Sequence, residues 1–460
     1  MTPSRGFGRG VSRRAFLAGA AALAGGLRTA SATTRARRGL RGDRLRVAIV
    51  GAGGRGGDDT ADLAATGLVD IVALCDVDQR QAADAFKKYP DAKRYSDWRR
   101  LLDTEKDIDA VMVATPDHNH AIISIAAMHH GKHVYCEKPL AHSIWEAREM
   151  ARVAASTGLV TQMGTQGHAY EGTRVAVEVL RAGMIGDVRE LHVWTDRPAG
   201  WWPQGVSRPV ETPPVPPELD WDVWLGPAPM RPYNEAYVPF KWRGFWDFGT
   251  GAIGDMGIHN LDTAYWGLEL GTPTSVSIKD CSPSLTDPAA KETAPLWSIL
   301  ELQFPARGTK PAVTMSWYDG GKLPPQELFQ GEKLITHDGG SLVIGTKGTL
   351  HADLARRRNR RRSLSPAAAQ AVRGCPDARA DAAAHAEPSS RVGQRVPRQG
   401  DDAVTVFLCV RPDGVAPVGE RRAARRQDDS VGSRRDARHR LPRGRPVCSA
   451  TIPRGMVVLS

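Results

Sequence analysis

The sequence predicts an α/β protein with two domains. The first is a doubly wound parallel sheet over residues 45–165, and the second is an α+β domain with an open, largely antiparallel sheet over residues 166–354. In the first region short apolar runs alternate with helical segments, which is the pattern of successive βαβ units. Between residues 275 and 317 the apolar runs follow one another without helices, as strands of an antiparallel sheet do. A chain of 460 residues has room for both domains.

The amino terminus resembles a twin-arginine transport leader. Residues 12–19 read SRRAFLAG, and a short apolar run and small residues ending near Ala32 follow. The apolar run is too short to cross a bilayer. We therefore expect residues 1–44 to be a signal peptide with a linker. The protein would then use the twin-arginine export machinery and be periplasmic or otherwise extracytoplasmic. The simpler alternative is a basic start followed by an alanine-rich helix.

A dinucleotide site is predicted where the first strand ends. The buried strand at 46–50 continues into GAGGRGG, and this G-x-G-x-x-G pattern is typical of a Rossmann domain. Its glycines allow a tight turn, a close approach of the backbone to a pyrophosphate, and packing of the next helix on the strand. That helix would point its amino terminus at the phosphates. The predicted cofactor contacts of the loop are Gly51, Gly53, Gly54, Arg55 and Gly56.

The second strand, at 70–75, ends in Asp76. An acidic side chain at this place accepts hydrogen bonds from the adenosine ribose and repels a 2′-phosphate. The predicted cofactor is therefore NAD, although NADP is not excluded. Next come a strand at 109–114, a helix at 121–130 and a strand at 132–136. Loops at the carboxyl ends of these strands border the cofactor crevice.

No metal site is predicted. His118 and His120 are two residues apart, but no third ligand lies near them in the sequence. The six cysteines show no C-x-x-C spacing.

The chain resembles the glucose-fructose oxidoreductase and inositol dehydrogenase family (Gfo/Idh/MocA). The motifs that carry the resemblance are GAGGRG, CDVD, ATPDHNH and CEKPL, and it extends over about residues 45–350. It implies that Lys138, in the tripeptide Glu137-Lys138-Pro139, lies beside the nicotinamide and the substrate hydroxyl. It also implies a cofactor loop that contains Thr115, Pro116 and His120, with Glu137 as a further contact.

A second set of candidate residues comes from the second domain. Asp255 and His259 are four residues apart, so a helix would carry both on one face. Alone, this spacing is more often a surface pair. The resemblance implies that His259 is the base and that Asp255 contacts the sugar or orients the site. Gln166, Lys241 and Arg243 are further candidates for substrate binding, with surface charge as the alternative for Lys241 and Arg243.

Aromatic residues are frequent between positions 194 and 248. Their faces suit the C–H groups of pyranose rings, but bulky aromatics also cover sheets, and the sequence leaves both interpretations open. The set comprises Trp194, Trp201, Trp202, Trp221, Trp224, Trp242, Trp246, Tyr233, Tyr237 and Phe240.

The last region, 355–460, differs in composition from the rest. It holds 23 arginines and 10 acidic residues, no Lys, Trp or Tyr, and the single phenylalanine Phe407. We expect either a disordered basic tail or a sequence translated out of frame, so that the second sheet breaks off at about Leu354. The net charge of +11 is concentrated in this region, so nucleic-acid binding is not expected.

These observations predict an NAD(P)-dependent oxidoreductase. It would transfer hydride between a carbohydrate or polyol carbon and a tightly held nicotinamide, and its partner would be a small-molecule carbohydrate. An intact relative would form a homo-oligomer. Two alternatives stay open: an NAD-dependent, redox-neutral enzyme that cleaves glycosides by oxidation, elimination and reduction, and an inactive fragment of such an enzyme.

Overall fold

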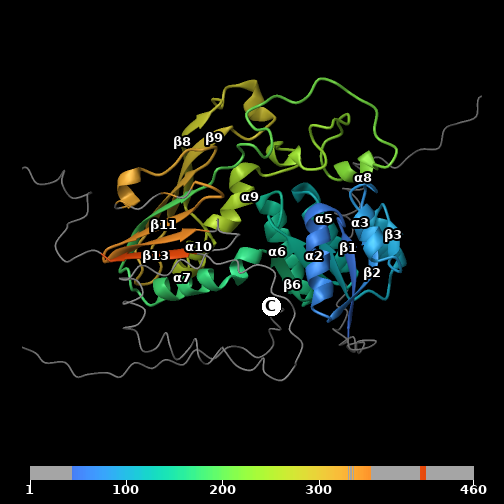
Figure 1. The fold of residues 1–460 in the computed structure, drawn as a ribbon, viewed down its shortest axis with the longest axis horizontal. Coiled ribbons are helices and arrows are strands. Elements are labelled where there is room, and N and C mark those ends of the chain that lie inside the picture. The colour runs from blue at the N-terminus through green and yellow to red at the C-terminus, as the bar shows by residue number, and fades with distance from the viewer. Residues whose placement is uncertain (1–43, 330, 332–333, 335, 354–404, 411–460) are drawn as a thin grey trace, which may run out of the picture. The chain divides into compact units, whose positions relative to one another are not determined.

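The computed structural model describes residues 44–329, 331, 334, 336–353 and 405–410 (Figure 1). The predicted leader at 1–44 lies outside these residues except for its last position. Most of the predicted tail at 355–460 also lies outside them. Within the described residues, no helix combines the length and the apolar character needed to cross a membrane.

The first sheet has six strands in the order β3-β2-β1-β4-β5-β6. The register pairs β1 with β4, β4 with β5, β5 with β6 and β2 with β3, all in parallel. The strand order reverses on the two sides of β1, which creates the crevice in which doubly wound folds bind ligands. The strands are β1 (Leu45–Val50), β2 (Val69–Cys75), β3 (Lys93–Tyr95), β4 (Ala110–Val113), β5 (His133–Glu137) and β6 (Thr161–Gly164).

Helices connect these strands, as the alternating pattern predicted. Parallel strands are covered on both faces, so residues such as Ala48, Val111 and Val113 are fully buried in one apolar cluster with Ile123 of α5. The predicted doubly wound sheet is therefore confirmed. The helices of this domain are α2 (Gly54–Ala65), α3 (Ala83–Lys88), α4 (Trp98–Thr104), α5 (Asp117–His129) and α6 (Ile144–Thr157).

The second sheet has seven strands in the order β13-β12-β11-β7-β10-β9-β8. Only the β7 and β10 pair is parallel, and the other recorded pairs are antiparallel. This confirms the predicted open, largely antiparallel sheet. The strands are β7 (Val188–Trp194), β8 (Ser275–Ser282), β9 (Trp297–Phe304), β10 (Val313–Tyr318), β11 (Gly340–Gly345), β12 (Gly348–Asp353) and β13 (Thr405–Val410).

Three helices pack on one face of this sheet (Figure 1). Val179, Met256 and Leu268, one from each helix, bury apolar side chains against Leu191 and Trp317 of the strands. These helices are α7 (Glu171–Arg181), α9 (Gly251–Asn260) and α10 (Asp262–Leu268). Shorter elements are α8 (Trp221–Leu225) and the 3₁₀ turns η2 (Gln166–Ala169), η3 (Lys241–Gly244), η4 (Pro288–Lys291) and η5 (Gln326–Phe329).

The second sheet extends beyond residue 354, where the sequence predicted that it breaks off. Thr405–Val410 forms β13 and pairs antiparallel with β12, so that Thr405 faces Asp353. The segment reads TVFLCV, and its β-branched and aromatic residues have high strand propensity. Composition averaged over the whole tail concealed this short run.

Most of the aromatic side chains between 194 and 248 belong to the protein core. Trp221 and Trp224 stack with ring centroids 4.7 Å apart, and Phe248 packs edge-on against Trp224. Their cluster also contains Tyr233, Tyr237, Trp242 and Phe245. Trp201, Phe240 and Trp246 are different, because 43%, 38% and 39% of their surfaces remain exposed. Of these three, Trp201 and Phe240 line the cleft described below.

Candidate active site and cofactor cleft

A cleft of about 540 Å³ lies where the carboxyl ends of the parallel strands face α9. It brings together residues from both sheets that are far apart in the sequence. The predicted residues that line it are Gly51, Gly53, Gly54, Arg55, Asp76, Thr115, Pro116, Glu137, Lys138, Gln166, Arg243, Asp255 and His259. Gly56, His120 and Lys241 are not among the lining residues.

The glycine loop has the geometry that the sequence pattern requires. Gly51 has a φ of +87°, and a Cβ atom there would lie 2.6 Å from the carbonyl oxygen of Ala114. At Gly56 a Cβ atom would overlap with the carbonyl oxygen of Gly51, so this glycine allows α2 to pack on β1. Gly56 therefore shapes the loop from behind, whereas Gly53 and Gly54 face the cleft.

Asp76 lies at the end of β2 and is tied to the glycine loop. Its carboxylate accepts hydrogen bonds from the backbone N–H groups of Gly53 and Asp78, both at 3.0 Å. Burial raises its pKa to about 6, although these hydrogen bonds oppose the shift. Asp76 is therefore ionised at neutral pH and can accept hydrogen bonds from a ribose.

We expect Asp76→Ala to weaken NAD binding by roughly tenfold and to reduce the preference for NAD over NADP. The physical reason is the loss of a charged acceptor and of the repulsion of a 2′-phosphate. Titration of both nucleotides by fluorescence measures the two dissociation constants. The exposed Asp91→Ala is the control, and an unchanged NAD to NADP ratio in Asp76→Ala would contradict the assignment.

His120 lies beneath the cleft surface and contacts the loop that contains Thr115. Its ring nitrogens lie 2.7 Å from the carbonyl oxygens of Pro139 and Thr115, and the residue is 1% exposed. The sequence placed His120 among the cofactor contacts. In the structure it connects the two loops that carry those contacts. His118 is similarly buried, with its ring nitrogens 2.9 Å and 3.2 Å from the carbonyl oxygens of Trp224 and Phe248.

Glu137 lies beside the glycine loop. One of its carboxylate oxygens accepts a hydrogen bond of 3.1 Å from the backbone N–H of Lys138. Burial, together with the charge of Asp59, raises the pKa of Glu137 to about 7. Arg55 forms an ion pair with Asp59 in the same cluster. The cluster fixes the end of β5, from which Lys138 projects.

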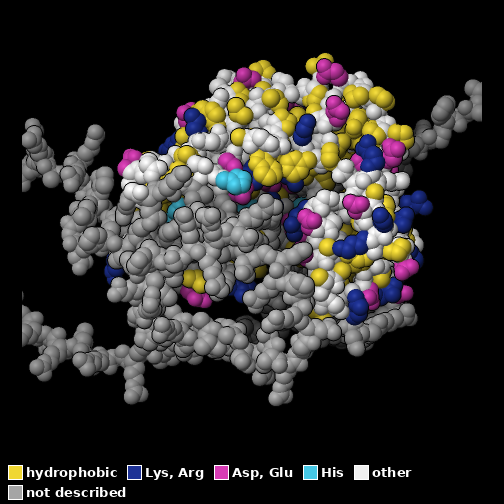
Figure 2. Space-filling model, viewed as in Figure 1, with side chains coloured by type: hydrophobic (Ala, Val, Ile, Leu, Met, Phe, Trp, Pro, Cys, Tyr) yellow, Lys and Arg dark blue, Asp and Glu magenta, His cyan; other side chains and the backbone are white. Residues whose placement is uncertain are grey.

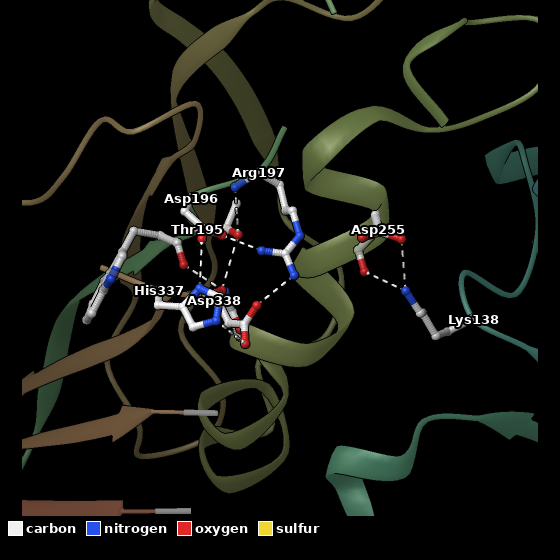
Figure 3. A network of polar contacts seen from close by, with 9 residues as sticks. Lys138, Thr195, Asp196, Arg197, Asp255, His337 and Asp338 are labelled. Atoms are coloured by element: carbon white, nitrogen blue, oxygen red, sulfur yellow. Dashed lines mark hydrogen bonds and ion pairs between the residues drawn. The ribbon is translucent and has the colours of Figure 1, made fainter. Parts of the chain in front are cut away.

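Lys138 meets Asp255 across the cleft (Figure 3). Its Nζ donates to Oδ1 of Asp255 at 2.9 Å and to the backbone oxygen of the same residue at 3.1 Å. Nε of Arg243 lies 3.4 Å from the same carboxylate oxygen. Burial would raise the pKa of Asp255, but the charges of Lys138 and Arg243 outweigh it and lower the pKa. Asp255 is therefore an ionised counter-charge.

His259 lies one helical turn after Asp255 on α9, and both side chains line the cleft. The predicted helix therefore places both residues in the same cavity. Burial, and then the charge of Lys138, lower the pKa of His259 to about 3. The imidazole is neutral at physiological pH and can accept a proton or a hydrogen bond.

The structure adds Arg197 and Asp338 to the site, which sequence reasoning missed. Arg197 donates to Asp338 at 2.6 Å and to Asp196 at 2.5 Å (Figure 3). Asp196, His337 and Asp338 place possible metal ligands within 4.8 Å of one another. The guanidinium of Arg197 already neutralises both carboxylates, and His337 is an exposed side chain. The sequence feature that could have pointed to Arg197 is its position in DRPAGWW, just after the strand that ends at Trp194.

Asp117 is a second buried residue of the cleft that the sequence analysis did not select. Thr250 donates a hydrogen bond of 2.9 Å to its carboxyl group. Burial raises the pKa of Asp117 to about 7, against the opposing charge of Arg243. The folded protein therefore keeps a proton on Asp117 in a pH range where the unfolded chain has lost it.

This pKa predicts a pH-dependent stability change for Asp117→Asn. Between the unfolded pKa of about 4 and the folded pKa of about 7, the folded state binds more protons, so wild-type stability falls as pH rises. Asn cannot ionise. We expect the free energy of unfolding of Asp117→Asn to rise by roughly 2 to 4 kcal/mol relative to that of wild type between about pH 5 and about pH 8. Urea unfolding of the nucleotide-free protein tests this, with the exposed Asp62→Asn as control; a pH-independent difference would contradict it.

The two remaining substrate candidates differ in position. Gln166 lines the cleft, and its Oε1 is buried without a hydrogen-bond partner among the described residues. Oγ1 of Thr115 is also buried without a hydrogen-bond partner among the described residues. Lys241 is exposed and lies outside the cleft. Its role in substrate binding stays a prediction.

The fold and the cleft define a class of protein with two domains, of which the first is a dinucleotide-binding Rossmann domain. Residues 45–165 match the model of an oxidoreductase family with an NAD-binding Rossmann fold, and residues 177–294 match the C-terminal alpha/beta domain of the same family. Together the two matches cover more than half of the chain. The chain belongs to the Gfo/Idh/MocA oxidoreductase family.

Several curated relatives are polyol or sugar dehydrogenases. The inositol 2-dehydrogenase of Burkholderia multivorans is 36% identical over 152 residues, which are 32% of this chain and 44% of the relative. That of Salmonella typhimurium is 31% identical over 151 residues (32% and 45%). The levoglucosan dehydrogenase of Pseudarthrobacter phenanthrenivorans is 27% identical over 192 residues (42% and 40%). The matches thus span less than half of the length of these relatives. A solved levoglucosan dehydrogenase with NADH and L-sorbose aligns with 20% identity, 67% and 73% coverage and a TM-score of 0.48.

Proposed function

We propose that the protein oxidises a secondary alcohol carbon of a carbohydrate or polyol and transfers the hydride to NAD. The observation that carries the proposal is the position of Lys138. Its ammonium group lies 2.9 Å from Asp255 in the same cleft as the glycine loop, Asp76 and His259. A cation and a neutral imidazole thus stand where a substrate hydroxyl would meet the cofactor.

The residues present fit a nicotinamide dinucleotide. Added Cβ atoms at Gly51 and Gly53 would come within 2.6 Å and 2.7 Å of backbone oxygens, so only glycines leave this cradle open. The amino terminus of α2 begins at Gly54 and suits a pyrophosphate. The unpartnered Oγ1 of Thr115 can bind a polar group of the ligand. When bound, NAD supplies the hydride acceptor.

The side chains have different roles in the proposed oxidation of the alcohol. The charge of Lys138 stabilises the developing alkoxide oxygen, because buried charges act strongly in a cleft shielded from water. The carbon loses its hydrogen with the electron pair, which NAD would accept, and the hydroxyl proton passes to the neutral imidazole of His259. Asp255 keeps Lys138 in place through the ion pair of 2.9 Å.

Two measurements test the proposal. The purified protein is denatured and the released nucleotide is identified by mass. The protein is then incubated with NAD and with myo-inositol, glucose or levoglucosan, and NADH is followed by absorbance. We expect released NAD and reduction with at least one member of the panel. Absence of any nucleotide binding, or NAD binding without reduction by any polyol or sugar, would refute the proposal.

The leader motif supports a further part of the proposal, which concerns location. We propose export by the twin-arginine pathway, with NAD acquired before export and retained by the enzyme. A second substrate would then recycle the cofactor. Replacement of Arg13 and Arg14 by Lys is expected to keep the protein in the cytoplasm in cell fractionation. Equal export of the variant and wild type would reject this part.

We also propose that the protein forms a homo-oligomer, and light scattering of the purified protein tests this.

A further inference from the structure

Trp201 and Phe240 form an exposed aromatic surface at the cleft, which we call the aromatic platform. Both residues line the cleft, and their ring centroids are 6.3 Å apart. The buried Trp202 supports Phe240 from a centroid distance of 6.1 Å. Most aromatic side chains of this region are buried, so the exposure of these two rings at a cavity marks a binding surface. Figure 2 shows hydrophobic side chains beside basic and acidic groups on one face of the described residues.

The guanidinium group of an arginine stacks on each ring of the platform. The guanidinium of Arg197 lies 3.7 Å from the ring centroid of Trp201, and that of Arg243 lies 4.2 Å from that of Phe240. These contacts cover one side of each ring and hold it in place. The partly exposed surfaces that remain are therefore rigid, which lowers the entropy cost of binding a ligand.

The same arginines connect the platform to the reacting groups. Arg243 reaches Asp255, the partner of Lys138. The positive charge of Arg197 contributes to the lowered pKa of His259. Phe240 is thus connected to Lys138 through Arg243 and Asp255, and the platform lines the same cleft as Lys138 and His259. A ligand that is oxidised between those two groups extends toward the platform if it is larger than one ring.

The charges around the platform identify the kind of ring. Arg197, which stacks on Trp201, is neutralised by Asp196 and Asp338, whereas Arg243 shares Asp255 with Lys138. An anionic group such as a phosphate beside Trp201 would have to displace the two carboxylates of Arg197. An uncharged ring with axial C–H groups or a π face can instead stack on Trp201 and Phe240 without disturbing the ion pairs.

We propose that the aromatic platform is a subsite for an uncharged second ring, so that a glycoside is a better substrate than the free monosaccharide. The inference rests on the proposed function, because the first ring of the glycoside is the one that is oxidised. The platform binds the ring attached through the glycosidic bond. Oxidation converts one hydroxyl-bearing carbon of the first ring to a ketone, with hydride going to NAD and the proton to the neutral imidazole of His259.

Matched glycosides test this subsite. For glucose, galactose and mannose, the methyl and phenyl glycosides differ only in the attached group, and NADH formation gives kcat/KM for each. We expect the phenyl to methyl ratio to be roughly tenfold in wild type for the sugar that reacts. The ratio should fall to about one in Trp201→Ala. Trp145→Ala is the matched control, because Trp145 is 70% exposed and does not line the cleft.

A binding measurement separates the subsite from the reaction. Saturation-transfer NMR on the NAD-loaded protein reports contacts of the phenyl ring whether or not turnover occurs. Turnover with equal ratios in wild type and Trp201→Ala would refute the subsite and leave the oxidoreductase intact. Phenyl contacts that Trp201→Ala removes, without any hydride transfer, would support the subsite and refute the activity. No phenyl contact in wild type, or a changed oligomeric state in Trp201→Ala, would also overturn the subsite.

Discussion

Replacing Lys138 by Met is expected to lower kcat by roughly three orders of magnitude while NAD remains bound. In the proposed reaction the ammonium group stabilises an alkoxide, and general acid–base and electrostatic groups of this kind each contribute about 10² to 10⁴ in rate. The side chain of Met has similar length, so packing beside Asp255 is largely kept. NADH formation measures kcat, and nucleotide titration measures binding.

Two further variants make this result specific. Lys310→Met removes an exposed lysine that pairs with Glu269 and should retain wild-type kcat. Loss of Lys138 leaves the buried Asp255 with Arg243 as its remaining cation, and Lys138→Met/Asp255→Asn also removes the carboxylate that Lys138 neutralised. If the double variant recovered full activity, the lysine would serve only to neutralise Asp255. A Lys138→Met enzyme with near-wild-type kcat would reject the catalytic assignment directly.

His259→Asn is expected to lower kcat/KM by roughly two to three orders of magnitude, because the amide cannot take up the hydroxyl proton. The pKa of His259, lowered to about 3, also predicts the pH profile. The imidazole stays neutral from about pH 5 to about pH 9, so it produces no loss of wild-type kcat/KM near the usual histidine pKa of about 6.5. A titration near that value that disappears in His259→Asn would contradict the structure.

The same lowered pKa affects stability, and this gives an independent check. Below about pH 6.5 the unfolded histidine binds a proton that the folded protein does not bind. Stability therefore falls as pH decreases from that value toward 3. His259→Asn removes this contribution, so its unfolding midpoint should decline less on acidification than that of wild type. His133→Asn, at a histidine of β5 outside the cleft lining, is the control.

Much of the fold could be predicted because its signals are local. The run at 46–50, the glycines after it and Asp76 specify one βαβ unit by short-range pattern. The four-residue spacing of Asp255 and His259 requires a helix to bring them onto one face, and α9 supplies it. These features depend on the periodicity of helices and strands, which the sequence displays directly.

Other features depend on contacts between distant segments. Arg197 meets Asp338 because β11 pairs with β7, in a register that sets Gly340 opposite Trp194. No local pattern reveals such a pairing. The aromatic residues likewise gave an undecided interpretation until burial separated the core cluster from Trp201 and Phe240. His120 was assigned to the cofactor loop through the family resemblance, and its hydrogen bonds join the carbonyl oxygens of Pro139 and Thr115.

Lys138 projects from the end of β5 and Asp255 from α9, so the ion pair also connects the two domains. A hinge motion that parts the domains would separate the ammonium from its carboxylate and from His259 at the same moment. The open form could exchange ligands but would lack an assembled proton acceptor. In the proposed reaction, chemistry would then require a closed cleft, because closure of an active site excludes water from around the reacting carbon.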